Sequence, residues 1–306
     1  MGANILITGG SGFLGSALAH YWVEAGNNLS ILVRPKSNLY RLEGIFEKIK
    51  IIKIEDEKKI NKIILNANPK IIVHTAVNYG KNDETKQQIY DANYSIGLKI
   101  LHGVLEGSQQ VVFINPDTVI QPSVSIYAAS KRKLAKVGDK LAKENPSKLK
   151  FINIRLQLMY GPGQNERSFP GFVFKDCIEN KNHINLTVGE QLRDFIYIDD
   201  CVSAFNTITQ NLNKFSTSDE IDIGSGNANS VRSFVEKIRQ LSKSNTLLKF
   251  GEIPNRKNEP LLCKADVQRL RSMGWEYKND EVNGIMKTIK FMTNIKNSNN
   301  KANKFN

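Results

Sequence analysis

The sequence predicts an α/β protein with a doubly wound parallel sheet, and three observations support this prediction. Short apolar runs alternate with helix-like stretches through the first half of the chain. A glycine-rich turn joins the first run to the first helix-like stretch. The runs are apolar along their whole length, which is typical of parallel strands covered by helices on both faces. We therefore expect repeated strand–helix–strand units.

Each element of the first half follows from a local pattern. Strands are predicted where short apolar runs are bounded by turn residues, and helices where apolar residues recur at helical spacing. Gly26 and the two asparagines after it end the first helix, and Pro146 follows the last. The predicted strands are 4–8, 29–33, 49–54, 70–75, 110–115 and 151–156, and the predicted helices are 13–25, 86–106 and 127–145.

The second half of the chain is less regular. Residues 161–194 are rich in Gly, Pro, Asn and charge, which is typical of binding loops. Residues 294–306 are rich in Asn and Lys with almost no apolar content, so we expect a frayed tail outside the fold. The remaining predictions are strands at 195–198 and 220–223 and helices at 230–243 and 281–293.

Composition narrows the class of protein. The 306 residues are 40% hydrophobic and 24% charged, which is enough to bury a core. The net charge of +13 is compatible with nucleic acid, a membrane surface or an anionic small molecule. No apolar run approaches the ~20 residues of a membrane span, and the N-terminus does not resemble a signal peptide. Three distant cysteines suggest neither disulfides nor a metal site, so we expect reduced thiols and a cytoplasmic location.

The turn at residues 8–15, TGGSGFLG, predicts a site for a dinucleotide. Gly9, Gly12 and Gly15 let the chain turn tightly between a strand and a helix. The backbone N–H groups at the start of that helix, including those of Phe13 and Leu14, would then face a pyrophosphate. The alternative is a glycine turn that binds nothing.

The end of the second predicted strand bears on the choice of cofactor. NAD-binding proteins usually place an acid there for the ribose 2′-hydroxyl, whereas a nearby Arg accommodates the 2′-phosphate of NADP. Here the sequence has no acid but offers Arg34 and Lys36. We therefore expect NADP(H), with NAD(H) possible if Arg34 is an ordinary solvated residue.

Tyr127 and Lys131 lie four positions apart on one face of a predicted helix. A phenol can transfer a proton to an alcohol oxygen if its pKa lies near the working pH, and a neighbouring Lys is expected to lower that pKa from about 10. Alone, such a pair is common by chance, and the alternative is a packed Tyr beside a solvated Lys.

Further motifs accompany this pair in a characteristic order. The first half adds IVHTA at 72–76, Asn93 and YAASK at 127–131, and the second adds MYGPG at 159–163, GEQLRDFIYIDD at 189–200 and IGSG at 223–226. With Asp266 and Trp275, these motifs resemble the extended short-chain dehydrogenase/reductase family. The similarity is to its nucleotide-sugar branch of epimerases, dehydratases and ketoreductases, including CDP-3,6-dideoxyhexose (abequose- and paratose-type) synthases. The resemblance covers residues 3–293.

The resemblance implies a division of labour along the chain. Residues 1–160 would form a Rossmann domain that binds NADP(H), with the chain returning to it at 194–226. Residues 161–293 would form a smaller, discontinuous α/β domain that binds a nucleoside diphosphate sugar, followed by a disordered tail at 294–306. The family also implies a homodimer, and it gives no reason to expect nucleic acid or a membrane as partner.

The resemblance also assigns roles to individual residues. Tyr127 would be the acid–base residue, and Lys131 would lower its pKa and hold the nicotinamide ribose. Arg256, in the sequence RKNE, would hold the nucleotide unless it is a solvated loop residue. The cofactor would be lined by His74, Thr75, Ala76 and Asn93, and the nucleotide part of the substrate would be held by Arg193, Arg256 and Glu259.

The sequence departs from the family after the fifth predicted strand. Pro116 occupies the position of the Ser or Thr that binds the reacting oxygen, and proline has no hydroxyl. Thr118 is the nearest substitute, with Ser123 and Ser125 as others; otherwise activity is weakened or lost. Asp117 is followed by Thr118, so one carboxylate of the dehydratase pair is missing.

Together these observations predict an NADPH-dependent reduction of the C4 keto group of a nucleoside diphosphate 4-keto-deoxysugar, with Tyr127 as the proton donor and Thr118 as its hydroxyl partner. The alternatives are a nucleotide-sugar 4-epimerase with tightly bound NAD and a catalytically inactive NADP(H)-binding protein. Nucleic-acid binding is disfavoured because aromatic residues are not interleaved with basic ones.

Overall fold

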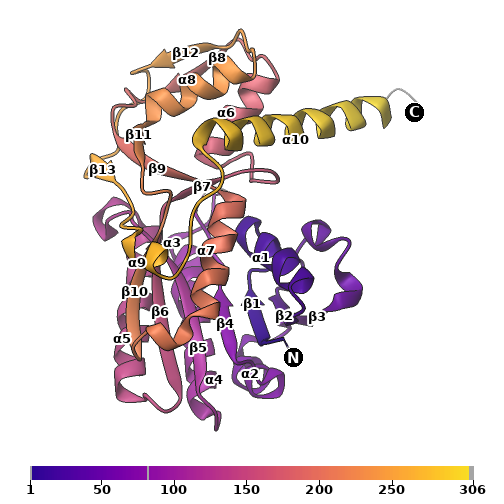
Figure 1. Cartoon of the computed structure of the whole chain (residues 1–306), viewed down its shortest axis with the longest axis vertical. Helices are drawn as coiled ribbons and strands as arrows, with labels where there is room; N and C mark the ends of the chain where they lie inside the picture. Colours follow the sequence, from indigo (N-terminus) through magenta and orange to yellow (C-terminus); the bar gives the residue numbers. More distant parts are fainter. Residues whose placement is uncertain (1, 81–82, 303–306) are drawn as a thin grey trace. The chain divides into compact units, whose positions relative to one another are not determined.

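The computed structural model describes residues 2–80 and 83–302 and divides the chain into two compact units (Figure 1). Unit 1 comprises Met1–Leu156 and Ala204–Ile223, and unit 2 comprises Gln157–Ser203 and Gly224–Asn306. The chain leaves unit 1 near residue 156, returns to it within a helix and leaves again after residue 223. Each unit is therefore made of two separate stretches of sequence.

Unit 1 is built on a parallel sheet in the order β10-β6-β5-β4-β1-β2-β3. Its seven strands, counted within the described residues, are β1 (Asn4–Thr8), β2 (Asn28–Val33), β3 (Ile49–Lys53), β4 (Ile71–His74), β5 (Val111–Thr118), β6 (Leu149–Leu156) and β10 (Ser218–Ile223). In this register Thr8 lies beside both Leu32 of β2 and His74 of β4. The carboxyl ends of three neighbouring strands thus lie together, and this is the side of the sheet where α/β proteins bind ligands.

Helices cover both faces of this sheet, which explains why its strands are apolar on both sides. On one face, α2 (Ile60–Ala67), α4 (Ile96–Glu106) and α5 (Ile126–Glu144) pack over Phe113 and Phe151. On the other lie α1 (Phe13–Glu24) and the part of α7 (Ile198–Gln210) that belongs to unit 1 (Figure 1). The predicted doubly wound Rossmann fold is confirmed.

The predicted helix over residues 86–106 contains an interruption. It begins as α3 (Lys86–Tyr90), widens into a π-helical turn at Asp91–Ser95 and continues as α4. Thr85 and Gln88 form a capping box at its start, with the Gln88 N–H donating to Thr85 Oγ1 at 3.2 Å. Hydrophobic spacing predicted one continuous helix here and did not reveal the wide turn.

Strand β5 extends three residues beyond its predicted end and includes Pro116. A proline in a central strand is unusual because it cannot donate a ladder hydrogen bond. Here the pairing of β5 with β4 ends at Ile114, while its pairing with β6 continues to Thr118. Pro116 therefore lies where β5 has one paired neighbour, and the strand carries Asp117 and Thr118 on to the sheet edge.

Unit 2 is a smaller α/β assembly built around β9 (Leu192–Tyr197). Its core includes Phe195 stacked on Phe234, with ring centroids 3.8 Å apart, and Tyr160 packed edge-on against Phe234. The other strands are β7 (Leu158–Tyr160), β11 (Ala228–Ser230) and β13 (Leu262–Cys263), all paired to β9, and the pair β8 (His183–Leu186) and β12 (Leu247–Phe250). The helices are α6 (Phe169–Ile178), α8 (Val231–Leu241), α9 (Gln268–Ser272) and α10 (Glu281–Ala302).

Two expectations for the second half need correction. The stretch 161–194 is not all loop, because α6 begins there with Ser168 as its N-cap and Pro170 in its first turn, where proline is tolerated. The tail is not frayed from residue 294, because α10 continues to Ala302. Extending an existing helix costs far less than starting one, so the polar Asn and Lys residues continue the helix that begins at Glu281. Residues 303–306 of the expected tail lie outside the described residues.

Candidate active site

The glycine turn connects β1 to α1 at the ligand-binding edge of the sheet. Gly9 has φ +67°, and a Cβ there would lie 2.5 Å from the backbone N of Ala76. A Cβ on Gly15 would lie 2.5 Å from the carbonyl oxygen of Gly9. The N-cap of α1 is Gly12, which has no side chain to cap the helix. The first-turn N–H groups of α1, from Phe13 and Leu14 onward, are thus available to an anion, and the turn fits the pyrophosphate of a dinucleotide.

The end of β2 presents two cations. Arg34 and Lys36 are exposed, and both lie in a turn closed by the Ser37 N–H, which donates to the Arg34 carbonyl at 3.0 Å. The Arg34 N–H in turn donates to Ser37 Oγ at 3.1 Å. Because β2 lies beside β1, this turn is next to the glycine turn in the sheet. The local fold therefore fixes the backbone of the turn that carries these two cations, beside the predicted dinucleotide site.

The end of β4 is tied to the end of β1 through Thr8. His74 Nδ1 lies 2.8 Å from Thr8 Oγ1, and Thr75 Oγ1 donates to the Thr8 carbonyl at 2.7 Å. The His74 side chain is completely buried, and burial followed by the Lys131 charge lowers its pKa to about 3. We expected His74 to line the cofactor, but its neutral ring belongs to the core. Ala76, whose N–H points to Thr8 Oγ1 at 3.4 Å, is the residue against which Gly9 packs.

Asn93 lies in the π-helical turn and is fully buried. Its Oδ1 accepts from the Asn78 N–H and its Nδ2 donates to the Asn78 carbonyl, both at 2.8 Å. The residue expected to line the cofactor therefore acts on the backbone of the loop that follows β4. In the structure the Asn93 side chain holds the backbone of this loop in place.

The residues predicted to transfer the proton lie at the start of α5 and the end of β5. Ser125 caps α5 by accepting from the Ala128 N–H at 3.2 Å. The Ser125 hydroxyl, one of the two alternatives to Thr118, is therefore already engaged. The side chain of Thr118 interacts with the Tyr127 phenol and lowers its pKa. Tyr127 is half-buried, and Lys131, one turn further along α5, is only 3% exposed. The structure thus brings Tyr127, Lys131 and Thr118 to one place, despite Pro116.

The expected low pKa of Tyr127 is wrong, because burial outweighs any effect of Lys131. The pKa of Tyr127 lies well above its ordinary value because burial penalises the phenolate, with Tyr79 and Asp117 adding to the rise; the Thr118 hydrogen bond opposes it. Burial also lowers the pKa of Lys131 from 10.5 to about 8, while Asp117 opposes this fall. At neutral pH the site therefore holds a neutral phenol and a protonated ammonium group.

Asp117 is sealed beneath this site. Its side chain has no exposed surface and makes an ion pair with Arg132 Nη1 at 3.4 Å. It also accepts from the Thr118 N–H at 2.7 Å and from Asn153 Nδ2 at 3.4 Å. A carboxylate held in this way acts as a buried counter-charge and cannot reach a substrate.

The residues predicted to hold the substrate nucleotide lie in unit 2. Arg193 Nη2 and Glu259 Oε1 form an ion pair at 2.9 Å, and Arg193 Nη1 also donates to the Leu192 carbonyl at 2.8 Å. Arg256 is exposed, and its carbonyl accepts from the Glu259 N–H at 3.3 Å. The structure thus brings Arg193 and Glu259 into contact and places Arg256 on the adjoining loop.

Comparison with known proteins identifies the family. A model of the NAD dependent epimerase/dehydratase family matches residues 5–224. This chain belongs to that family. The predicted resemblance to extended short-chain dehydrogenases/reductases is thereby confirmed, as is the prediction of an NAD(P)-dependent enzyme.

Curated relatives of this family member match it along nearly its whole length. The CDP-abequose synthase of Salmonella typhimurium is 28% identical over 301 residues, covering 94% of this chain and 97% of the relative. The dTDP-4-dehydro-6-deoxyglucose reductase of Escherichia coli is 27% identical over 314 residues, covering 94% and 96%. The solved UDP-glucose 4-epimerase of Thermotoga maritima shares the fold with a TM-score of 0.80 at 20% identity, covering 95% of this chain and 99% of that one.

The motifs of the second half hold this family member's unit 2 together. Asp194 accepts from the Ser225, Gly226 and Ala265 N–H groups, which joins three distant stretches of chain. Asp200 likewise accepts from the Lys278 N–H at 2.7 Å, and Trp275 donates to Ser203 Oγ at 2.9 Å. These motif residues, to which no ligand contact was assigned, therefore stabilise the fold of unit 2. Among the described helices, none is long and apolar enough to cross a membrane.

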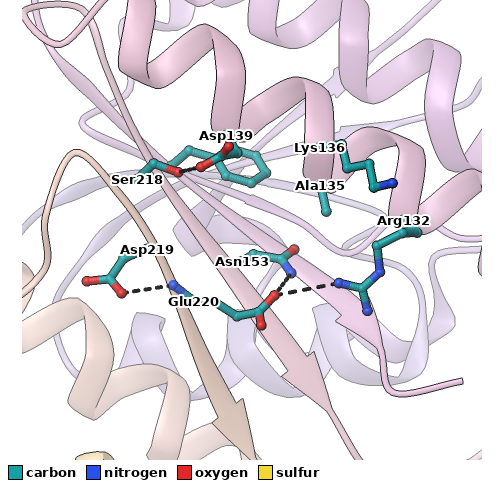
Figure 2. A pocket seen from close by; sticks show the side chains of 9 residues that line it. Arg132, Ala135, Lys136, Asp139, Asn153, Ser218, Asp219 and Glu220 are labelled. Carbon is teal, nitrogen blue, oxygen red and sulfur yellow. Dashed lines mark hydrogen bonds and ion pairs between the residues drawn. The ribbon is translucent and has the colours of Figure 1, made fainter. Parts of the chain in front are cut away.

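A depression of about 400 Å³ lies between α5 and the edge strand β10 (Figure 2). In its wall Glu220 Oε2 accepts from Asn153 Nδ2 at 2.8 Å and lies 3.6 Å from Arg132 Nη1. The wall also includes Asp139, which accepts from Ser218 Oγ at 2.6 Å. None of its lining residues is a predicted site residue.

Sequence reasoning missed one neighbour of the site. Tyr79 lies on the loop after β4, with its ring centroid 5.0 Å from that of Tyr127. The available signal was its position three residues after the Ala76 that ends the IVHTA motif.

Proposed function

We propose that this protein reduces the C4 keto group of a nucleoside diphosphate 4-keto-deoxysugar with NADPH. The proposal rests on the place of Thr118, at the end of β5, next to the Tyr127 phenol, whose pKa it lowers, and on the buried Lys131 one turn along α5. Thr118 would supply the hydroxyl that Pro116 lacks. Two full-length relatives, a CDP-abequose synthase and a dTDP-4-dehydro-6-deoxyglucose reductase, support a keto-sugar substrate.

The raised pKa of Tyr127 suits a proton donor. A neutral phenol at working pH carries the proton that the C4 oxygen receives, and the nicotinamide cofactor supplies the hydride. As the phenol loses its proton, Thr118 donates a hydrogen bond to the phenolate and the Lys131 ammonium group offsets its charge. Lys131 remains mostly protonated at neutral pH because its pKa is about 8.

The same geometry disfavours a 4,6-dehydratase. That reaction needs two carboxyl groups that reach the sugar, one to remove a proton and one to expel a hydroxyl. Asp117 is sealed and paired with Arg132, and Thr118 stands where the second acid would be. Reduction needs neither carboxylate.

NADP(H) is the cofactor we propose for unit 1. Arg34 and Lys36 would bind the 2′-phosphate, because both are exposed, their turn is fixed by Ser37, and the end of β2 offers no acid to a 2′-hydroxyl. Gly9 and Gly12 would admit the pyrophosphate to the N-terminus of α1. Thr75 and Ala76 complete the adjoining wall.

Unit 2 would bind the nucleoside diphosphate part of the substrate. Arg193 and Arg256 supply guanidinium groups, which match phosphate geometry with two hydrogen bonds at once. Glu259 holds Arg193 in one orientation through their 2.9 Å ion pair. Arg256 is exposed to solvent, where it would meet the phosphates.

The test is NADPH oxidation by the purified protein with a panel of CDP-, dTDP-, UDP- and GDP-linked 4-ketosugars. We expect oxidation with at least one of them and none without a sugar nucleotide. Tyr127→Phe should abolish the reaction while retaining NADPH binding, and Tyr21→Phe on α1 serves as the matched control. No oxidation with the whole panel would refute the proposal. Stoichiometric NAD released on denaturation would instead favour the 4-epimerase, and dinucleotide binding without any turnover would favour the inactive protein.

A further inference from the structure

Tyr79 combines contact with the proton donor and a large exposed surface. Its ring is 5.0 Å from that of Tyr127 and tilted by 38°. The residue nevertheless remains 54% exposed. Its aromatic surface is therefore presented to solvent beside the phenol that would donate the proton.

The loop that carries Tyr79 is built to hold it there. Buried Asn93 clamps the Asn78 backbone through two 2.8 Å hydrogen bonds. The Asn78 side chain then accepts from the Gly80 N–H at 2.9 Å, so Tyr79 lies inside a closed turn. Gly80 has φ +68°, and a Cβ there would lie 2.5 Å from Ile89 Cδ1. This turn thus favours glycine at position 80 because of its backbone conformation.

The place of Tyr79 limits what it can touch. If the reacting C4 oxygen lies at the Tyr127 hydroxyl, a ring centred 5.0 Å from the Tyr127 ring lies near the substituents of the neighbouring sugar carbons. In a 6-deoxysugar the C6 carbon, attached to C5, is a methyl group, and this group needs no hydrogen-bond partner. An aromatic face buries a methyl group favourably, whereas a hydroxymethyl group there would lose hydrogen bonds to water.

Resting on the function proposed above, we propose that Tyr79 determines specificity for a 6-deoxysugar by packing its ring against the C6 methyl group. Asn93, Asn78 and Gly80 position the ring for this contact. The reaction itself needs Tyr127, Lys131 and Thr118, whereas Tyr79 selects which 4-ketosugar reaches them.

The test uses equilibrium binding, which does not depend on turnover. Calorimetry in saturating NADP⁺ would compare dTDP-6-deoxyglucose with dTDP-glucose, and the corresponding CDP pair, on wild type, Tyr79→Ala, Tyr79→Phe and Tyr21→Ala. We expect wild type to bind the 6-deoxy ligand of the recognised nucleotide about five- to tenfold more tightly, near the lower limit for one apolar group because the ring is half exposed. Tyr79→Ala should reduce the preference to less than about twofold, while Tyr79→Phe and Tyr21→Ala should keep it.

Three outcomes would overturn the proposal: equal affinity of the wild type for both members of each pair, an unchanged preference in Tyr79→Ala, or loss of the preference in Tyr79→Phe, which would assign recognition to the hydroxyl. Thermal unfolding of each variant checks that the loop change leaves the fold intact. Failure of the proposed reduction is seen separately, as wild type that does not oxidise NADPH with any 4-ketosugar. A merely structural Tyr79 would weaken binding of both ligands alike.

Discussion

Replacing Lys131 with methionine should abolish activity and stabilise the protein at neutral pH. Lys131 is 3% exposed, so folding places its ammonium group in a poorly solvated position. Methionine keeps most of the aliphatic stem and removes the charge. Asp117 retains a partner in this variant because Arg132 Nη1 lies 3.4 Å away.

The magnitude follows from the pKa of Lys131. Burial lowers it from 10.5 to about 8, and at about 1.4 kcal/mol per pKa unit this corresponds to roughly 3 kcal/mol of unfavourable free energy at neutral pH. Below pH 8 the group is charged in both folded and unfolded states, so the full cost is present. Between pH 8 and 10.5 only the unfolded state keeps the proton, so wild-type stability rises with pH.

The assay is urea unfolding followed by tryptophan fluorescence at pH 7 and pH 10. Lys131→Met should exceed wild type by about 2–3 kcal/mol at pH 7, and the gap should shrink by more than half at pH 10. Lys136→Met is the matched control, because Lys136 is exposed on the same helix and its removal should change stability by no more than about 0.5 kcal/mol. A variant less stable than wild type at pH 7, or a gap that does not change with pH, would refute the reasoning.

Three further outcomes test the site. Thr118→Val should lower kcat by about 10- to 100-fold with little change in KM, and Thr118→Ser should recover most of it, as steady-state kinetics would show. Asp117→Asn should move the alkaline limb of the pH–rate profile to lower pH, since Asp117 raises the pKa of Lys131; an unmoved limb contradicts this role. Gly9→Ala should cost about 1–3 kcal/mol and most dinucleotide affinity in fluorescence titrations, whereas Gly26→Ala, where a Cβ meets no atom within 4 Å, should retain the affinity.

The sequence predicted the sheet and the dinucleotide edge because both depend on local patterns. An apolar run that ends at Thr8, continues into a glycine turn and is followed by a helical pattern indicates a strand, a phosphate-binding turn and a helix. Thr118 was chosen as the substitute hydroxyl because it is the nearest one, two residues beyond Pro116. Its catalytic role stays a prediction.

The features of the site that the sequence did not reveal depend on packing between distant segments. The burial of His74 against Thr8 and Phe113 depends on three different strands, so the motif IVHTA alone did not reveal it. The pKa of Tyr127 was misjudged because the sequence shows the neighbouring Lys131 but not the burial that outweighs it. Asn93 looked like a cofactor ligand, and its clamp on Asn78 depends on a π-helical turn that periodicity does not predict.

The acidic strand β10 has a consequence for how the protein behaves in concentrated solution. An open strand edge is a template for another chain, and β10 is an edge of the seven-stranded sheet in the described part of the molecule. Its Glu220 N–H is already taken by Asp219 Oδ1 at 2.9 Å, and Asp222 adds a third carboxylate to the strand. Glu220 and Asp222 both pair with Arg155, so the side chains of this edge are engaged within the molecule. An edge whose polar groups are occupied in this way is a poor template for a strand of a second copy, which disfavours self-association through β10.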